Sequence, residues 1–208
     1  MTSDRPGFDL YLITDRLTLP PGRLLLDTLE QALIGGVRAV QLREKDLSAS
    51  ELFELAMKMR SLTRRHEARL LINDRIDVAL AVKADGVHLG HHSLPADQAR
   101  ALLGPRKLIG VSTHQLEEIP VAAQNGADFV TFSPVYQTPS KASYGPPQGL
   151  ERLQSACRIS SIPVFALGGI RLDRVQEVRD CGAHGVAVIS AIFAAADPSG
   201  AARAFTKS

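Results

Sequence analysis

Short hydrophobic runs rich in β-branched residues recur along the chain, separated by segments whose hydrophobic positions follow a helical spacing. Runs of this kind are typical of strands that are buried on both faces. There are eight of them, at residues 10–15, 39–44, 69–74, 86–90, 108–113, 129–135, 163–169 and 185–190. The pattern therefore predicts eight strands that alternate with helices.

The segments between the runs predict helices because their hydrophobic residues lie three or four positions apart. The residues that mark four of these segments are Leu24, Leu25, Leu29 and Leu33; Leu52, Leu55, Ala56 and Met59; Leu116, Val121 and Ala122; and Val175 and Val178. Two stretches, 47–51 and 112–118, carry a Ser or Thr shortly before a Glu, which is the signature of a helix start. Apolar strands that alternate with helices indicate a parallel sheet covered on its outer face.

Eight strand–helix repeats favour a closed (β/α)8 TIM barrel of the α/β class. The chain has 208 residues, which is at the short end for this fold, so the loops are expected to be tight. A doubly wound open sheet is the alternative, but "LITDRLTLP" stands where a GxGxxG motif would follow the first strand. No linker divides the chain, which predicts one domain over residues 1–208 with its core at about 9–194.

The overall composition is that of an ordinary globular protein, with 45% hydrophobic residues, 22% charged residues and a net charge of +2. No long basic run points to nucleic acid, and no apolar stretch of about 18 residues points to a membrane span. The N-terminus lacks the hydrophobic segment of a signal peptide, and the cysteines form no CxxC motif. We therefore expect a cytoplasmic protein whose partners are small molecules, and the sequence is compatible with a homo-oligomer.

Polar residues gather where the strands end, and the active site of a barrel lies at the carboxyl ends of its strands. Gln41, Arg43 and Lys45 alternate along the second strand, so all three can point into the barrel. The two cations suit a polyanion such as diphosphate, because Arg offers a forked contact and Lys a point charge. In the alternative interpretation the strand stops at Leu42 and both cations are solvated.

The third strand ends in an amide and a carboxylate, Asn73 and Asp74. A carboxylate at the mouth of a pocket can hold Mg²⁺, which prefers oxygen ligands and shares them with substrate phosphates. Alternatively, either residue could cap a helix that begins at Arg75. The nearby cations Arg43 and Lys45 favour the magnesium interpretation.

The last two strands end in Gly168, Gly169 and Ser190, at the corner where many barrels bind a phosphate group. The glycines permit close approach of the backbone, and Ser190 can donate its hydroxyl at the start of the final helix. A tight turn with a capping serine is the alternative.

The stretch "HLGHH" places His88, His91 and His92 close together, which raises the hypothesis of a metal site. Against it, His88 lies on the strand while the other two lie past a glycine. No further Cys or His has a diagnostic spacing.

The stretch 132–150 begins as a strand and continues into a segment rich in Pro and Gly. Thr138, Ser140 and Lys141 offer two hydroxyls and one ammonium within four positions, which suits a bound anion. A surface loop with no role in binding is the alternative. At the end of the sixth strand of a barrel, these residues would face Arg43 and Lys45 across one mouth.

Seven motifs together resemble the thiamine-phosphate synthases and their sister group, the thiazole tautomerases. They are "LYLITD", "VQLREKD", "INDRIDVALAVKADGVHLG", "IGVSTH", "FSPVYQTPSK", "ALGGI" and "GVAVISAI", in consistent order from about Leu10 to Ala194. The resemblance implies a (β/α)8 barrel. It also implies a transferase that joins hydroxymethylpyrimidine diphosphate to hydroxyethylthiazole phosphate and releases pyrophosphate.

The resemblance also implies roles for single residues. Arg43, Lys45 and Lys141 would be catalytic, and Asp74 would bind Mg²⁺. The residues that would hold the substrates are Gln41, Asn73, Ser112, Thr138, Ser140, Gly169, Ile189 and Ser190. The implied chemistry is dissociative, since pyrophosphate leaves before the thiazole nitrogen attacks, and it needs electrostatic stabilisation of the leaving group.

One position departs from the synthase pattern, in which "HLG" is followed by "QED" and the aspartate is a second magnesium ligand. Here the stretch is "HLGHHS", so Ser93 takes that place. A neutral hydroxyl is a weak magnesium ligand, which favours a thiazole tautomerase or a non-catalytic relic that binds thiazole or thiamine phosphate. The clamp at 138–141 and Pro134 favour the synthase, and a tautomerase would need an acid–base group among His88, His91, His92 and His114.

Overall fold

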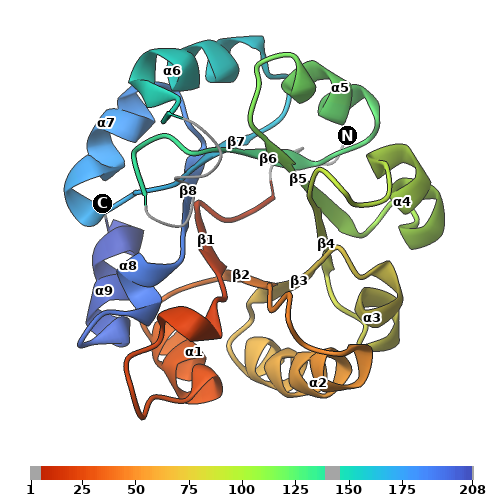
Figure 1. The fold of residues 1–208 in the computed structure, drawn as a ribbon, viewed down its shortest axis with the longest axis vertical. Coiled ribbons are helices and arrows are strands. Elements are labelled where there is room, and N and C mark those ends of the chain that lie inside the picture. The colour runs from red at the N-terminus through yellow and green to blue at the C-terminus, as the bar shows by residue number, and fades with distance from the viewer. Residues whose placement is uncertain (1–5, 139–145, 208) are drawn as a thin grey trace.

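The computed structural model describes residues 6–138 and 146–207. Its parallel strands form a closed barrel in chain order, and helices surround the barrel (Figure 1). The strands are β1 (Leu10–Ile13), β2 (Ala39–Leu42), β3 (Arg69–Asn73), β4 (Gly86–Leu89), β5 (Leu108–Thr113), β6 (Phe129–Phe132), β7 (Val164–Leu167) and β8 (Gly185–Val188). Each predicted run contains one strand, so the predicted TIM barrel is confirmed.

The barrel closes between its first and last strands. β1 pairs with β2 on one side and with β8 on the other, where Leu10, Tyr11 and Leu12 lie opposite Val186, Ala187 and Val188. In an open sheet, β1 and β8 would be edge strands, or one of them would lie between other strands. The open-sheet alternative is therefore wrong.

Helices follow the strands around the outside of the barrel. They are α1 (Leu25–Ile34), α2 (Ala49–Arg65), α3 (Ile76–Ala81), α4 (Ala96–Leu103), α5 (Glu118–Gln124), α6 (Gly149–Ile159), α7 (Val175–Asp180), α8 (Ser190–Phe193) and α9 (Pro198–Lys207). Ser190 begins the short α8, whereas α9 is the last helix described and lies against α1 and α8. The expectation that Ser190 starts the final helix is therefore wrong. No helix among the described residues combines the length and hydrophobicity needed to cross a membrane.

Of the two predicted helix starts, one is confirmed. Ser48 caps α2 in a reciprocal capping box with Glu51. At 112–118 the prediction is wrong, because Ser112 lies in β5 and α5 begins only at Glu118. The Glu118 carboxylate instead accepts hydrogen bonds from the main-chain N–H groups of His114 and Gln115, at 2.6 and 3.1 Å.

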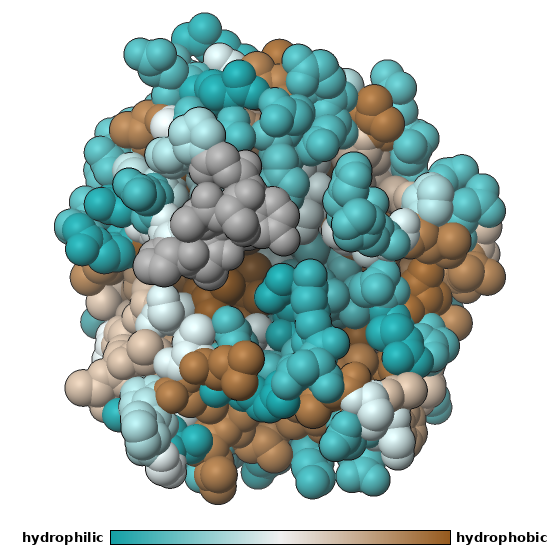
Figure 2. Space-filling model, viewed as in Figure 1, coloured by the Kyte–Doolittle hydropathy of each residue, from teal (hydrophilic) through white to brown (hydrophobic). Residues whose placement is uncertain are grey.

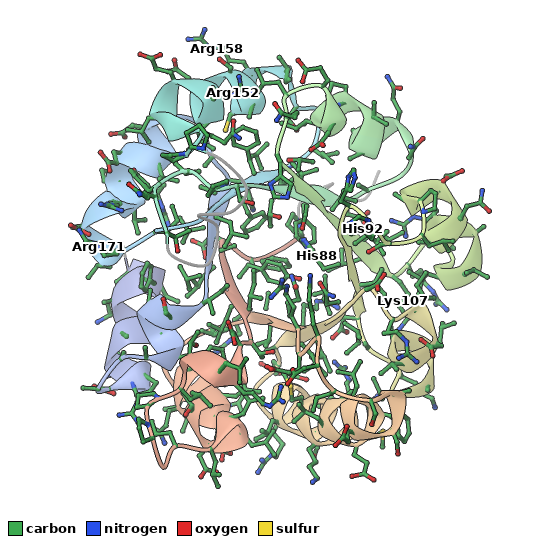
Figure 3. The ribbon with its side chains drawn as sticks, viewed as in Figure 1. His88, His92, Lys107, Arg152, Arg158 and Arg171 are labelled. Carbon is green, nitrogen blue, oxygen red and sulfur yellow. The ribbon has the colours of Figure 1, made fainter. Side chains whose placement is uncertain are left out.

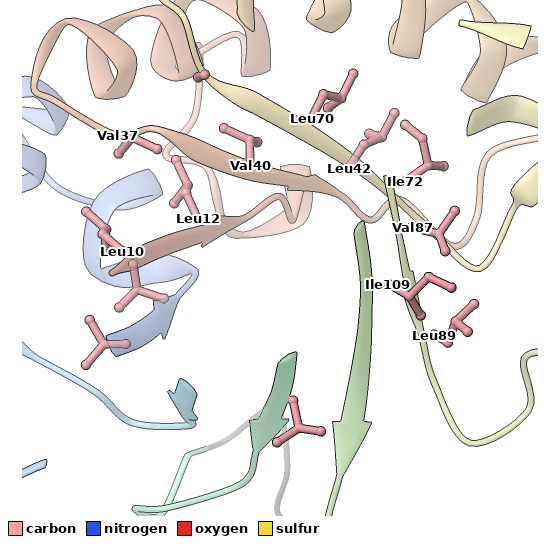
Figure 4. Packing of buried hydrophobic residues seen from close by; sticks show 14 of the residues in the cluster. Leu10, Leu12, Val37, Val40, Leu42, Leu70, Ile72, Val87, Leu89 and Ile109 are labelled. Carbon is pink, nitrogen blue, oxygen red and sulfur yellow. The ribbon is translucent and has the colours of Figure 1, made fainter. Parts of the chain in front are cut away.

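Alternation along each strand separates an inner core from an outer one. On β1, Tyr11 and Ile13 belong to the cluster inside the barrel, and Leu10 and Leu12 belong to the larger cluster between strands and helices. Figure 4 shows residues of that larger cluster, including Leu12, along the outer face of the strands. The strands are hydrophobic throughout because both of their faces are buried.

Candidate active site

A cavity of about 710 Å³ is lined by residues at the carboxyl ends of the strands. Seven of the predicted site residues line it, namely Gln41, Arg43, Lys45, Asn73, Asp74, Ser112 and Ile189. In Figure 2, hydrophilic residues lie to the right of the centre of the view and hydrophobic residues lie to its left. The fold thus brings together side chains from strands that are far apart in the sequence.

In the segment after β2, the basic and the acidic side chains have different surroundings. Strand β2 ends at Leu42, as the solvated alternative assumed, yet Arg43 is half-buried and lines the cavity together with the exposed Lys45. The acids that alternate with them bind Arg16, whose Nη1 donates to Glu44 at 3.1 Å and to Asp46 at 2.6 Å. The alternative that both cations are solvated is therefore wrong for Arg43 and correct in part for Lys45.

Arg16 also shapes the electrostatics of this segment. Its hydrogen bonds lower the pKa of the Asp46 carboxyl, which keeps that group ionised. Glu44 is buried and receives both the guanidinium and the main-chain N–H of Arg16. Because Arg16 satisfies both acids, they compete less with an incoming anion for Arg43 and Lys45.

Asp74 presents its carboxylate at the cavity from an unusual backbone conformation. It follows the last residue of β3 with φ at 65°, a left-handed conformation that Asp adopts more readily than most residues. Its N–H donates a hydrogen bond of 2.9 Å to the carbonyl of His88. Helix α3 begins at Ile76 without a side-chain cap, so the helix-capping alternative is wrong.

The surroundings of Asp74 bear on whether Mg²⁺ fits. Ser93 lines the same cavity, and its Oγ accepts a hydrogen bond of 2.7 Å from the N–H of Gly90. Among residues 6–138 and 146–207, no three His, Cys, Asp or Glu side chains are grouped to hold a metal. Asp74 alone suits Mg²⁺ where diphosphate and water supply the other oxygen ligands, which is its usual mode of binding.

His88 is a buried, neutral group. Figure 3 shows it inside the ring of strands, whereas Arg158 and Arg171 lie at the outer edge. Burial, together with the charge of Arg43, lowers the pKa of His88 to about 3. The expectation that His88 could be an acid–base group with an ordinary pKa is therefore wrong, and the rings of His91 and His92 contact each other with centroids 5.0 Å apart.

The glycines after β7 pack against the segment after β6. Gly168 and Gly169 have φ of 99° and 66°, and a Cβ at Gly169 would lie 2.9 Å from the Cβ of Tyr136. Arg174 links the two segments, because its Nη1 donates to the Gly169 carbonyl at 2.7 Å and its guanidinium lies 4.3 Å from the centre of the Tyr136 ring. The predicted phosphate corner is thus held beside the segment that leads to Thr138.

Some predicted residues are not part of the cavity just described. Thr138, Gly169 and Ser190 are outside its described lining. Ser190 is exposed and is the first residue of α8, and Ile189 at the N-cap makes no capping side-chain bond, so the capping-serine alternative is wrong. Ser140 and Lys141 lie outside the described residues, so the anion clamp stays a prediction.

The structure adds functional candidates that sequence reasoning missed. Arg16 and Glu44 form the contact that organises the segment after β2, and Tyr11 contacts His88 beneath the cavity. The alternation of charge in "REKD" was a usable signal for Glu44. No local pattern pointed to the contact between Tyr11 and His88, which lie 77 residues apart.

Comparisons with known proteins agree with this arrangement. A family model described as "Thiamine monophosphate synthase" matches residues 10–192. A relative from Geobacter sulfurreducens, provisionally named a thiamine-phosphate synthase, is 58% identical over 95% of this chain and 92% of its own length. A thiamine-phosphate synthase from Syntrophomonas wolfei is 46% identical over 94% of this chain and 93% of its own length.

A solved structure supports the same relationship. Thiamine phosphate pyrophosphorylase from Pyrococcus furiosus matches with a TM-score of 0.86 and 38% sequence identity, covering 96% of this chain and 94% of that one. The barrel, the residues at the carboxyl ends of its strands and these similarities lead to one conclusion. The chain belongs to the thiamine monophosphate synthase family.

Proposed function

We propose that this protein is a thiamine-phosphate synthase. It would join 4-amino-2-methyl-5-hydroxymethylpyrimidine diphosphate to 4-methyl-5-(2-phosphooxyethyl)thiazole and release pyrophosphate. The observation that carries the proposal is the grouping of Arg43, Lys45 and Asp74 around one cavity at the carboxyl ends of the strands. The synthase names of the relatives support it over a thiazole tautomerase.

The cations provide what the reaction needs most. The bond between the pyrimidine methylene carbon and the diphosphate oxygen breaks, and its electron pair leaves with the pyrophosphate. The lone pair of the thiazole nitrogen then forms the new carbon–nitrogen bond. Arg43 and Lys45 would stabilise the charge that grows on the leaving group, because both line the cavity and the main-chain N–H of Arg43 is anchored to Thr14.

Mg²⁺ is part of the same proposal, with Asp74 as the residue that would hold it. When bound, the ion would neutralise negative charge on the diphosphate. Ser93 provides only a neutral oxygen on the same cavity, so the substrate would supply most of the ligands. We expect metal affinity to be weak without diphosphate and to rise when diphosphate is present.

The corner beyond β7 would take the thiazole phosphate. Gly169, Ile189 and Ser190 would hold that phosphate, and Thr138, Ser140 and Lys141 would line the diphosphate and thiazole side. We also place the enzyme in the cytoplasm, with small phosphorylated molecules as its partners and with neither nucleic acid nor membranes. Self-association is part of the expectation, and the mass of the purified protein in solution tests it.

The test is a reconstituted reaction with purified protein, Mg²⁺ and both substrates. Thiamine phosphate and pyrophosphate should appear in equal amounts. Interconversion of thiazole isomers without thiamine phosphate would instead identify a tautomerase, and tight binding of thiazole phosphate without turnover would identify a non-catalytic relic.

Variants at Arg43 connect the reaction to this cavity. Arg43→Met should lower kcat/KM for the pyrimidine substrate by about ten- to a hundredfold, the loss expected for one charge-assisted contact. Arg43→Lys keeps the positive charge but not the paired hydrogen bonds of a guanidinium group, so its kcat/KM should fall less. Equal activity of the wild type and Arg43→Met would remove Arg43 from the proposed site.

A further inference from the structure

A chain of polar side chains crosses the interior of the barrel beneath the cavity. The Gln41 amide donates to the Tyr11 hydroxyl at 3.2 Å, and that hydroxyl lies 3.5 Å from Nδ1 of His88. On the other side of the ring, Nε2 of His88 lies 3.0 Å from Oγ of Ser112. We call Gln41, Tyr11, His88 and Ser112 the relay.

The relay joins buried groups to groups that face the cavity. Tyr11, Gln41 and His88 are 0%, 1% and 2% exposed, and buried polar groups of this kind are almost always hydrogen-bonded. Gln41, His88 and Ser112 line the cavity, whereas Tyr11 lies deeper among aromatic rings. The hydrogen bonds inside the barrel therefore influence what Gln41 and Ser112 present to a substrate.

The ring of His88 is held in one place. Gly110 lies directly beside it, since a Cβ at Gly110 would be 2.5 Å from Nδ1 of His88 and 2.5 Å from the Phe129 ring. The Phe129 ring packs against His88 at 5.9 Å between centroids, and Oγ1 of Thr131 lies 3.4 Å from Nε2. The absence of a side chain at residue 110 thus creates the space that the relay occupies.

The direction of the relay follows from the donor at Gln41. Because its amide donates to the oxygen of Tyr11, the Tyr11 hydroxyl can donate to Nδ1 of His88. With the Tyr11 hydroxyl as the donor to Nδ1, the His88 imidazole would carry its hydrogen at Nε2 and donate it to Ser112. Gln41 then retains its carbonyl oxygen as an acceptor, and Ser112 retains its hydroxyl hydrogen as a donor.

We propose that Tyr11 and His88 are positioning residues that set substrate specificity, because they fix Gln41 as an acceptor and Ser112 as a donor at the pyrimidine site. This inference rests on the proposed function. A 4-aminopyrimidine ring carries amino hydrogens that the Gln41 oxygen accepts and ring nitrogens that a hydroxyl can address. A 4-oxopyrimidine ring has an acceptor where the amino group was, so binding it requires the relay to reverse.

Nitrogen-15 NMR of the full-length protein tests the direction of the relay without any turnover. The expected signature of His88 is a neutral ring with hydrogen on Nε2 and an acceptor at Nδ1. Hydrogen on Nδ1 would overturn the proposal. The tautomer is read whether or not the protein is a synthase, so failure of the relay and failure of the proposed function are distinguishable.

Tyr11→Phe tests specificity by removing one hydroxyl from a buried ring. The variant should raise KM for the aminopyrimidine diphosphate about tenfold, leave KM for the thiazole phosphate unchanged, and reduce discrimination against the oxopyrimidine analogue about tenfold. Should wild-type turnover be absent, the same discrimination is measured by calorimetry as the ratio of the two pyrimidine affinities. Wild-type discrimination in Tyr11→Phe would overturn the proposal.

Phe129→Leu is the matched control, because Phe129 contacts the rings of both Tyr11 and His88 and has no polar atom. It should lower the unfolding temperature while keeping the Nε2 tautomer and the discrimination between the two pyrimidines. Equal loss of discrimination in Phe129→Leu and Tyr11→Phe would mean that packing alone sets specificity, and would overturn the proposal.

Discussion

The guanidinium group of Arg16 donates a hydrogen bond of 3.1 Å to the carboxylate of Glu44, which lies 28 residues further along the chain. Glu44 is only 6% exposed, and a buried polar side chain is costly unless it is hydrogen-bonded. The main-chain N–H of Arg16 donates to the same carboxylate at 3.2 Å. The loop after β1 and the segment that carries Arg43 and Lys45 are therefore tied together.

Arg16→Ala should destabilise the protein and weaken the pyrimidine site together. The free energy of unfolding should fall by about 1–3 kcal/mol, because Glu44 loses a charged hydrogen-bond donor. KM for the pyrimidine diphosphate should rise as Arg43 and Lys45 lose their anchor. Urea unfolding and steady-state kinetics measure the two effects.

Arg171→Ala is the control for this prediction. Arg171 pairs with Asp173 at 3.3 Å, but both side chains are largely exposed. Exposed ion pairs contribute little, so its loss should cost less than about 1 kcal/mol and leave KM unchanged. A similar loss of stability in both variants would contradict the special role of the pair between Arg16 and Glu44.

Gly168→Ala should disturb the phosphate corner. The position has φ at 99°, and a Cβ there would lie 2.7 Å from the Cα and Cβ of Pro134. Neither the backbone nor the proline ring can move aside easily, so the turn should shift. We expect a loss of more than about 1 kcal/mol of stability and a higher KM for the thiazole phosphate.

Gly104→Ala separates this clash from backbone strain. Gly104 has φ at 74°, and a Cβ there would meet nothing within 4 Å. Gly104→Ala should also lower the free energy of unfolding, by about 1 kcal/mol, because of its backbone conformation, but it should leave KM for the thiazole phosphate unchanged. An unchanged KM in Gly168→Ala would show that the turn plays no part in substrate binding.

Ser93→Asp should strengthen magnesium binding. Ser93 and Asp74 line one cavity, so a carboxylate at residue 93 would add an anionic oxygen near the first. We expect about tenfold tighter Mg²⁺ binding in the presence of pyrophosphate, since ligand charge tunes the affinity of such sites. Calorimetry measures this affinity, and Ser93→Asn, which matches the shape without the charge, should behave as the wild type. Equal affinities in the Asp and Asn variants would argue against a shared metal site.

Burial of neutral His88 should make the protein less stable in mild acid. The pKa of this ring is lowered from 6.5 to about 3 on folding, so between these values the unfolded chain binds a proton that the folded protein does not. The free energy of unfolding should therefore fall as pH drops below 6.5, by up to about 1.4 kcal/mol per pH unit.

The comparison of metal-free wild type with His88→Gln isolates this effect. Between pH 7 and pH 5 the variant should lose about 2 kcal/mol less stability than the wild type. Between pH 7 and pH 8 the two should change in parallel, because His88 is neutral in both states of the wild type. Identical losses in acid would show that His88 is not buried as a neutral ring.

Much of the fold could be predicted from the sequence because it depends on local periodicity. Hydrophobic runs such as that of β1 are determined by burial on both faces, and their number and order identify the barrel. The same periodicity placed Gln41 and Arg43 at one cavity. The prediction of a helix start at 112–118 was wrong because Ser112 is part of β5. The carboxylate of Glu118, and not a capping hydroxyl, accepts the hydrogen bond from the N–H of His114.

The barrel and the set of polar residues at the carboxyl ends of its strands could therefore be predicted from the amino-acid sequence alone. Which of these residues are neutral, and which are paired with one another, depends on contacts that form only in the folded barrel. Arg16 meets Glu44 across 28 residues and Tyr11 meets His88 across 77. Contacts of this range, and the loss of water around His88 that lowers its pKa, arise only when the strands close into a ring.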